Sequence, residues 1–425
     1  MLPPPFLENK LTVGIVAPFA GKDDGRPVSR THVTWLRNRL SRLYDQFLWR
    51  MFGRWRFHFS TYEDRVNTNR GDMAIRIATR ALLAEAIGDV AEFIEIGWDD
   101  LDEGFLARSS GDVDLVVLAG GGYLFCDSEG KLAPRVGRHL DTLMQLPCPV
   151  VGFCLGMNRL VGTSDVRQSD IAPTSQPLIK RFFQRLALSS VRDHWAKHAL
   201  RQVGEDTIAV LPDPALYLNA IVPENLPQPG AHDELWIGVN LAFHGKETTP
   251  ILAQQLPVIV DVLRQLRARK ECRFFYFVHY DTERLIPRLL AQAGISVTVV
   301  DCRPEEMVAW YRLLHVHICS MLHSSILAFN AHIPTINFAY DIKNYAFYEM
   351  MGMSDWILPA TPLQAEEILC RLEALIANRK ELSARIAQRK DMLRLDLDRF
   401  LELIAGLAHA RPESGRSVED RVAQL

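Results

Sequence analysis

The side chains best suited to proton transfer and anion binding stand in four short segments, each beside a turn. The first is Asn69–Asp72 (NRGD), which precedes an amphipathic stretch that begins near Met73. Gly71 permits a tight turn, and Asp72 is placed to cap a helix. Exposed amides at such a helix start favour an anion, and the Asp72 carboxylate could instead take a proton from a hydroxyl. An ordinary turn and helix cap explains the same residues without a ligand.

The second segment is a run of three glycines, Gly120, Gly121 and Gly122, which follows the apolar run DLVVLA. Glycines at the carboxyl end of a buried strand leave backbone amides open to a ligand. Close packing of the strand against its loop explains the run equally well.

The third segment, SSVRD, contains Arg192 and Asp193 and leads into a predicted helix. The Arg192 guanidinium would stand at the end of a strand, where it could grip a carboxylate or phosphate with two hydrogen bonds. We expect Asp193 to cap the helix, and the PDP sequence at Pro212–Pro214 to form a rigid turn.

The fourth segment, SMLHSS, contains Ser320, His323 and Ser324 and lies between a predicted strand and a predicted helix. At a helix start, His323 could hydrogen-bond a phosphate or deliver a proton. Tyr340 and Lys343, which follow the next strand, could complete the same pocket with a hydroxyl donor and a cation.

The elements that must position these segments are short apolar runs that alternate with amphipathic stretches, a pattern that predicts βαβ units and parallel sheets. One series of predicted strands covers residues 11–18, 91–96, 114–119, 148–154, 185–191 and 207–211. A second series covers residues 235–241, 273–279, 296–300, 315–319 and 334–338. We therefore predict an α/β protein with two doubly wound, Rossmann-like domains and a ligand cleft between them.

The two series are separated by a segment rich in proline and glycine, NAIVPENLPQPGAHDE, where we place the domain boundary. The predicted first domain covers residues 1–220 and the second covers residues 233–409, with residues 361–409 helical throughout. Residues 410–425 are predicted to form a polar, disordered tail.

The charge, the cysteine count and the length of the apolar runs exclude several classes of protein. A formal net charge of -3 argues against nucleic acid as a partner. Seven cysteines without a CxxC pair predict a reduced, cytoplasmic protein without a metal site. We find no apolar run long enough to span a bilayer.

Residues 22–58 interrupt the alternating pattern. They carry eight arginines and three aspartates, with three tryptophans interleaved. We predict a basic amphipathic helix inserted after the first strand. It could serve as a lid or oligomer contact, or rest on anionic lipid at the inner face of the plasma membrane.

Taken together and in this order, the segments resemble the polysaccharide pyruvyltransferase family. The resemblance lies in an NxGD segment before a helix, a strand followed by GGG, an RD pair before a helix and a later PDP, and then an S-x-L-H segment followed by P-x-I-x-x-x-Y-x-x-K. These segments are Asn69–Asp72, Gly120–Gly122, Arg192–Asp193, Pro212–Pro214, Ser320–His323 and Pro334–Lys343.

This resemblance implies a glycosyltransferase-B-like fold. It also implies transfer of a pyruvyl group from phosphoenolpyruvate to two hydroxyls of a saccharide or lipid-linked saccharide in bacterial exopolysaccharide or cell-surface synthesis, with no further cofactor. Arg192 is then expected to hold the donor's anionic groups, His323 to bind phosphate or deliver a proton, and Asp72 to orient or deprotonate the acceptor. The other residues expected to line the substrate site are Asn69, Gly71, Gly120, Gly121, Gly122, Ser320, Ser324, Tyr340 and Lys343.

One departure from the family pattern concerns the residue before the Leu-His pair, where the family usually has arginine and this chain has Met321. Lys343 or Lys246 then supplies the missing cation, or the donor differs, or activity is lost. Three alternatives therefore stay open. They are a nucleotide-sugar glycosyltransferase of the same fold, a non-catalytic relative that binds a saccharide or a protein, and a metal-dependent phosphate enzyme. The last has the least support because no acidic cluster such as DxD follows a strand.

Overall fold

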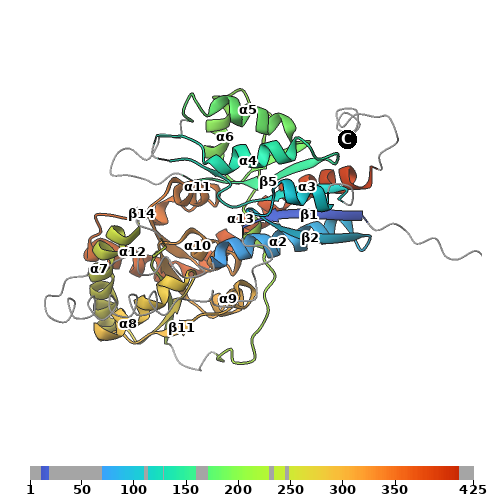
Figure 1. Ribbon diagram of the computed structural model, residues 1–425. Helices are drawn as coiled ribbons and strands as arrows, with labels where there is room; N and C mark the ends of the chain where they lie inside the picture. The colour runs from blue at the N-terminus through green and yellow to red at the C-terminus, as the bar shows by residue number, and fades with distance from the viewer. Residues whose placement is uncertain are drawn as a thin grey trace, which may run out of the picture.

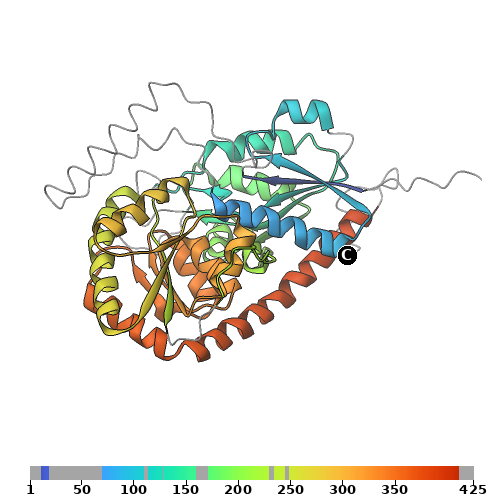
Figure 2. The same ribbon diagram turned by 90° about the horizontal axis from the view of Figure 1, so that it is seen from below.

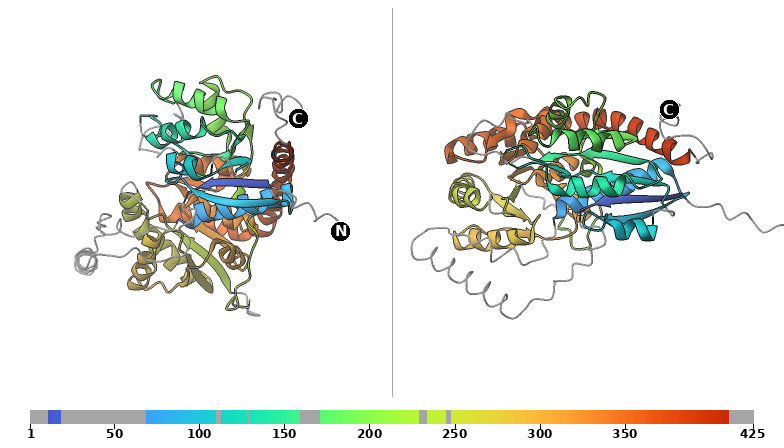
Figure 3. Two further views of the ribbon diagram at one scale, coloured as in Figure 1. Left: turned by 45° about the vertical axis from the view of Figure 1, so that its right-hand side comes forward. Right: turned by 45° about the horizontal axis from the view of Figure 1, so that its top comes forward.

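The protein is described here by a computed structural model, which covers residues 11–18, 69–109, 113–127, 129–158, 171–228, 234–244 and 248–410. The predicted basic helix at residues 22–58, Lys246 and residues 411–425 of the predicted tail lie outside these ranges. Two parallel sheets stand in separate halves of the molecule (Figures 1 and 3).

The first sheet is fully parallel and has the strand order β2-β1-β3-β5-β7-β8. Its strands are β1 (Leu11–Ala17), β2 (Ala91–Gly97), β3 (Leu115–Ala119), β5 (Val150–Leu155), β7 (Leu188–Val191) and β8 (Ala209–Val210). Its helices are α2 (Arg70–Ile87), α3 (Glu103–Ser109), α4 (Pro134–Leu143), α5 (Gln176–Arg185) and α6 (His194–Arg201), followed by the 3₁₀ helix η2 (Pro214–Tyr217).

The second sheet is also parallel and has the order β11-β10-β9-β12-β13-β14, the strand order typical of dinucleotide-binding domains. Its strands are β9 (Leu235–Asn240), β10 (Cys272–Phe277), β11 (Thr298–Val300), β12 (Val316–Cys319), β13 (Thr335–Ala339) and β14 (Ile357–Pro359). Its helices are α7 (Thr248–Arg269), η3 (Asp281–Leu285), α8 (Ile286–Gln292), α9 (Pro304–Tyr311), α10 (Leu322–Asn330), α11 (Ile342–Met350), η4 (Ser354–Trp356) and α12 (Ala365–Ala377).

All eleven predicted strands are present, and the prediction of two Rossmann-like units is confirmed. Three short strands were not predicted: β14 and the two-residue strands β4 (Leu124–Phe125) and β6 (Met157–Asn158), which pair with each other. The predicted continuous helix over residues 361–409 is wrong at its start, because α12 begins at Ala365 after a cis Thr361–Pro362 bond. It is also divided at Asn378.

The last helix, α13 (Arg379–His409), joins the two domains (Figure 2). Leu382, Ile386 and Leu393 near its start belong to the core of the second domain. Leu397, Phe400, Leu401, Ile404 and Leu407 pack instead into the core on one face of the first sheet. The helix therefore buries its apolar stripe on both domains in turn.

Arg70, at the first position of α2, makes several polar contacts with the second domain. Its guanidinium forms ion pairs with Asp301 and, at 3.6 Å, with Asp281. Its Nε donates to the carbonyl oxygen of Cys302 at 3.1 Å, and its backbone N donates to the carbonyl oxygen of His279 at 3.0 Å. The start of α2 is thereby held against the second domain.

Removing the aromatic ring from Phe400 should separate α13 from the first sheet. Phe400 is 6% exposed and stacks on Phe153, with ring centroids 6.2 Å apart. We expect Phe400→Ala to lower the free energy of unfolding by about 3–5 kcal/mol, as buried Phe→Ala changes do. Leu395→Ala, on the same helix but 61% exposed, should change it little. Chemical denaturation of both variants measures the difference, and equal losses would contradict this packing.

Candidate active site

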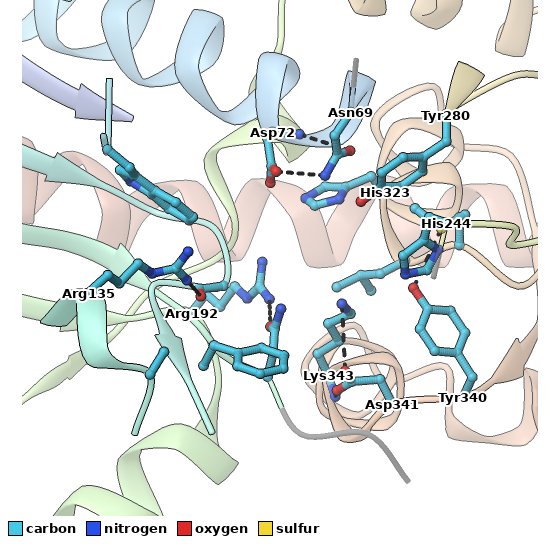
Figure 4. A pocket seen from close by; sticks show the side chains of 17 residues that line it. Asn69, Asp72, Arg135, Arg192, His244, Tyr280, His323, Tyr340, Asp341 and Lys343 are labelled. Atoms are coloured by element: carbon cyan, nitrogen blue, oxygen red, sulfur yellow. Dashed lines mark hydrogen bonds and ion pairs between the residues drawn. The ribbon is translucent and has the colours of Figure 1, made fainter. Parts of the chain in front are cut away.

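A cavity of about 340 Å³ lies between the two domains (Figure 4). Both domains contribute to its wall. The lining residues from the first domain are Asn69, Asp72, Trp98, Gly122, Phe125, Ala133, Arg135, Asn158 and Arg192. Those from the second domain are His244, Tyr280, Met321, Leu322, His323, Tyr340, Asp341 and Lys343.

Strand direction explains why these side chains meet. Trp98 and Arg192 directly follow β2 and β7, and Met321 and Tyr340 closely follow β12 and β13. The carboxyl ends of parallel strands share one edge of a sheet, and ligands of such folds bind beyond that edge. The carboxyl-end edges of the two sheets face the same cavity. Residues that are far apart in the sequence therefore line it together.

The NRGD segment opens α2, but its cap differs from the prediction. Asn69, not Asp72, is the cap: its Oδ1 accepts from the backbone N of Gly71 at 2.9 Å and of Asp72 at 3.4 Å. The Asp72 carboxylate is therefore released toward the cavity, where it accepts a hydrogen bond from Asn69 Nδ2 at 2.6 Å. A Cβ on Gly71 would overlap the His323 ring, so glycine there lets the two domains approach.

A buried carboxylate, Asp213, links the predicted residues Arg192 and His323. Arg192 Nη1 lies 3.0 Å from Asp213 Oδ2, and Nη2 donates to Asn158 Oδ1 at 3.0 Å. The His323 Nε2 atom lies 3.7 Å from the same Asp213 oxygen. Asp213 was predicted only as part of a turn, and it does cap η2, through the backbone N of Ala215. Asp213 thus lies between Arg192 of the first domain and His323 of the second domain.

Burial changes the charge states of two carboxyl groups here. Burial alone would raise the pKa of Asp213, but His323 and Arg192 outweigh it and lower that pKa to about 2. Burial raises the pKa of Asp72, although the nearby cationic groups, His323 foremost, act in the opposite direction. Asp213 is therefore a permanent anion, whereas Asp72 is the carboxyl group that can exchange a proton closer to neutral pH.

The second-domain wall is formed mainly by rings. His244 stacks on Tyr280, with centroids 4.7 Å apart, and the Tyr340 hydroxyl lies 3.5 Å from the Met321 sulfur. Burial, and then Lys343, lowers the pKa of His244 to about 3, so this imidazole is neutral at physiological pH. Met321, where the family resemblance led us to expect an arginine, adds no charge to this wall.

Lys343 is the cation of this wall. It stands in the first turn of α11, and its Nζ lies 3.7 Å from the carboxylate of Asp341, the residue that caps the helix. Burial lowers the pKa of Lys343, while Asp341 opposes that change. An ammonium group has three donors, and the 3.7 Å contact with Asp341 does not occupy all of them, so donors remain for a ligand.

Several predicted site residues lie away from the cavity wall. Ser320 Oγ accepts from the backbone N of Ala242 at 2.7 Å, and Ser324 Oγ is bonded to Tyr311 and His317, so both serines are buried in the second-domain interior. The backbone N of Gly120 donates a hydrogen bond to the carbonyl oxygen of Phe153 at 2.8 Å and is not open to a ligand. Of the glycine run, only Gly122 lines the cavity, and Asp193 caps α6 as predicted.

Other wall residues were not predicted. Trp98, Arg135, Asn158, His244 and Tyr280 stand singly on different elements, outside the segments that formed the resemblance. Trp98, Asn158, His244 and Tyr280 all follow a strand closely, and this position is the one signal that could have identified them. Within the ranges that the structure covers, no group of three or more His, Cys, Asp or Glu residues is arranged to hold a metal ion, and no helix is both long and apolar enough to cross a membrane.

Comparison with known proteins gives a family and a fold. The model of the family described as Polysaccharide pyruvyl transferase matches residues 69–342, more than half of the chain. No protein with a curated description matches the sequence.

Among solved structures, a putative UDP-N-acetylglucosamine 2-epimerase from Listeria monocytogenes has 10% identity and a TM-score of 0.50, over 89% of this chain and 91% of that one. The S. aureus MnaA–UDP co-structure has 11% identity and a TM-score of 0.49, over 78% and 94%. Glycosyltransferase SnogD from Streptomyces nogalater has 19% identity and a TM-score of 0.43, over 79% and 80%. The Listeria structure shares the fold of this chain, two facing Rossmann-like domains.

Neutralising Asp213 should leave the Arg192 cation buried without its counter-ion. We expect Asp213→Asn to cost about 3–5 kcal/mol of unfolding free energy at pH 7. The folded-state pKa of about 2 lies below the unfolded value of about 3.9, so this carboxylate stabilises the fold fully above pH ~4 and progressively less as the pH falls toward 2.

The difference between wild type and Asp213→Asn should therefore shrink over that pH interval. Denaturation at a series of pH values measures it. Asp206→Asn is the control, because the Asp206 side chain is 77% exposed. A difference that stays constant from pH 7 to 2 would contradict the ion-pair assignment.

Proposed function

The chain belongs to the polysaccharide pyruvyl transferase family, and we propose that it transfers a pyruvyl group from phosphoenolpyruvate to two hydroxyls of a saccharide. The observation that supports this most is that Asp72, Arg192 and His323, far apart in the sequence, line one cavity. A carboxylate that can exchange a proton thus stands in the same cavity as groups suited to hold an anion.

The donor would bind by its two anionic groups, a carboxylate and a phosphate. His323 stands in the first turn of α10 and Lys343 in the first turn of α11, where the helix dipole adds positive potential. Arg192 has part of its guanidinium fixed by Asp213 and Asn158, which orients it without consuming all five of its donors. Lys343 then supplies the charge that Met321 lacks.

The cavity size supports a small donor. Its volume of about 340 Å³ lies near the lower end of the roughly 300–1,000 Å³ range for ligand pockets. Phosphoenolpyruvate and one sugar ring fit this description better than an extended nucleotide sugar.

The proposed reaction needs one acid and one base. One sugar hydroxyl adds to C2 of phosphoenolpyruvate while C3 takes a proton and becomes a methyl group. The C2–O bond to phosphate then breaks, and a second hydroxyl of the same sugar adds to C2, giving the ketal and inorganic phosphate. One hydroxyl proton is balanced by the new methyl group, and the other leaves with phosphate.

Asp72 is the proposed base and His323 the proposed acid or phosphate partner. Asn69 donates a hydrogen bond to the Asp72 carboxylate and so orients it toward the cavity. The saccharide acceptor would be part of a cell-surface polysaccharide or of its lipid-linked precursor. Contact with a membrane surface would then fall to residues 22–58.

The decisive experiment is a thermal-shift titration with phosphoenolpyruvate and, separately, a panel of nucleotide sugars. A ligand at 100 times its Kd stabilises the fold by about 2.7 kcal/mol, which raises the melting temperature measurably. We expect phosphoenolpyruvate to stabilise wild type and the exposed control His198→Gln, but not His323→Gln. Phosphate should be released only when saccharide is also present.

A shift with nucleotide sugars instead would favour a glycosyltransferase and overturn the proposal. No response to either class of ligand would favour a non-catalytic relative.

The role of Asp72 can be tested through the pH profile. Because burial raises its pKa, turnover should fall as the pH drops through a value above the ordinary carboxyl range, where Asp72 becomes protonated. Asp72→Asn should lower turnover by about 10²–10⁴-fold and abolish this acidic limb. Asp89→Asn, at an exposed position after α2, is the control. An unchanged profile in Asp72→Asn would remove Asp72 from the mechanism.

A further inference from the structure

Arg135 is a half-buried cation of the cavity wall that has no carboxylate within ion-pair distance in the described part of the chain, although Asp72 and Asp99 lie near enough to oppose the lowering of its pKa by burial. Its Nη2 donates to the carbonyl oxygens of Gly122 at 2.7 Å and Tyr123 at 3.4 Å, and its Nε is buried without a hydrogen-bond partner among the described residues. Its guanidinium stacks 4.0 Å from the centre of the Trp98 ring. A cation that is desolvated, held rigidly and left without a counter-ion favours a bound anion.

The helix that carries Arg135 increases this positive potential. Arg135 is the second residue of α4, at the positive end of the helix dipole. The first turn of α4 has no acidic residue, and the cap residue, Ala133, makes no side-chain hydrogen bond and itself lines the cavity. A cation at this end of a helix is unfavourable unless an anion lies beside it.

The position of Arg135 separates it from the proposed donor groups. It stands on the first-domain wall, opposite Lys343 of the second domain (Figure 4). Its neighbour Trp98 is close to the proposed base, because a Cβ built on Gly121 would lie 3.7 Å from the Trp98 ring and 3.6 Å from Asp72 Oδ1. Arg135 is therefore on the side of the cavity where Asp72 would meet the acceptor.

Two aromatic residues of the cavity wall lie near this position. Phe125 lines the cavity with 37% of its surface exposed, and its carbonyl oxygen accepts from the backbone N of Ala133 at 2.8 Å, next to the start of α4. The Trp98 ring stacks against the guanidinium. Rings beside a fixed cation suit a sugar that packs an apolar face on them and presents a charged group to the arginine.

We propose that Arg135 binds an oxyanion of the acceptor, so that the enzyme's preferred acceptor is an acidic saccharide, either a uronate or a sugar phosphate. The inference rests on the proposed function for the role of Asp72. The position and contacts of Arg135 are observed in the structure and do not depend on which donor the enzyme uses. Arg192 cannot take this part as readily, because Asp213 already neutralises it.

The test is calorimetric binding of matched saccharides in the absence of donor. Each pair has a neutral methyl hexoside and the corresponding methyl uronide, from glucose, galactose and mannose, and each free hexose is also compared with its 1-phosphate. Wild type should bind the charged member of at least one pair about tenfold to a hundredfold more tightly, as a charged hydrogen bond allows. Arg135→Gln should remove that preference, and Arg135→Lys should keep part of it.

Arg138→Gln is the matched control, because Arg138 is an exposed residue one turn along the same helix, outside this cavity. It should keep the full preference. Equal binding of charged and neutral members by wild type would overturn the proposal even if Arg135→Gln failed to fold.

A preference that survives in folded Arg135→Gln would also overturn it. So would a weaker affinity for phosphoenolpyruvate in this variant with the saccharide preference intact, since Arg135 would then serve the donor. Because donor is absent from the saccharide titrations, failure of the enzyme to use phosphoenolpyruvate would leave their result unaffected.

Discussion

The geometry of the cavity depends on one buried carboxylate that two domains share. Asp213 is 2% exposed and lies within 4 Å of a guanidinium nitrogen of Arg192 and an imidazole nitrogen of His323. Moving the domains apart would leave Asp213 paired with Arg192, since both belong to the first domain, but would remove the His323 imidazole from the Asp213 carboxylate. Gly71 permits this closeness because a side chain there would displace the His323 ring.

The cations of the cavity differ in how far an acidic side chain already balances their charge. Arg192 is oriented and neutralised by Asp213, and Lys343 is partly balanced by Asp341, whereas Arg135 forms no ion pair within the described residues. Met321 removes one more charge from the second-domain wall, which becomes a surface of rings.

The sequence predicted the sheets well and the cavity wall only in part, for physical reasons. Buried parallel strands are short apolar runs, so their periodicity reveals them, and even the short strands β8 and β11 stand within such runs. The two-residue strands β4 and β6 closely follow glycines, and β14 ends in Pro359, so the sequence around them reads as turns. His323 was found because it follows a strand and opens a helix. Ser324 sits one residue later but on the inner side of that helix, a difference in direction that spacing does not show. Arg135 belongs to no motif, and only packing brings it to the cavity.

The path of α13 has a consequence for how the chain acquires its structure during synthesis. One face of the first sheet is covered by side chains between Leu397 and Ala408, near the end of the chain. The ribosome synthesises these residues after β9–β14 of the second domain, so the strands of the first domain emerge before this part of their apolar cover exists. The first sheet therefore reaches its final core only after the second domain has been made. Until then, its uncovered strands are apolar surface of the kind that favours aggregation.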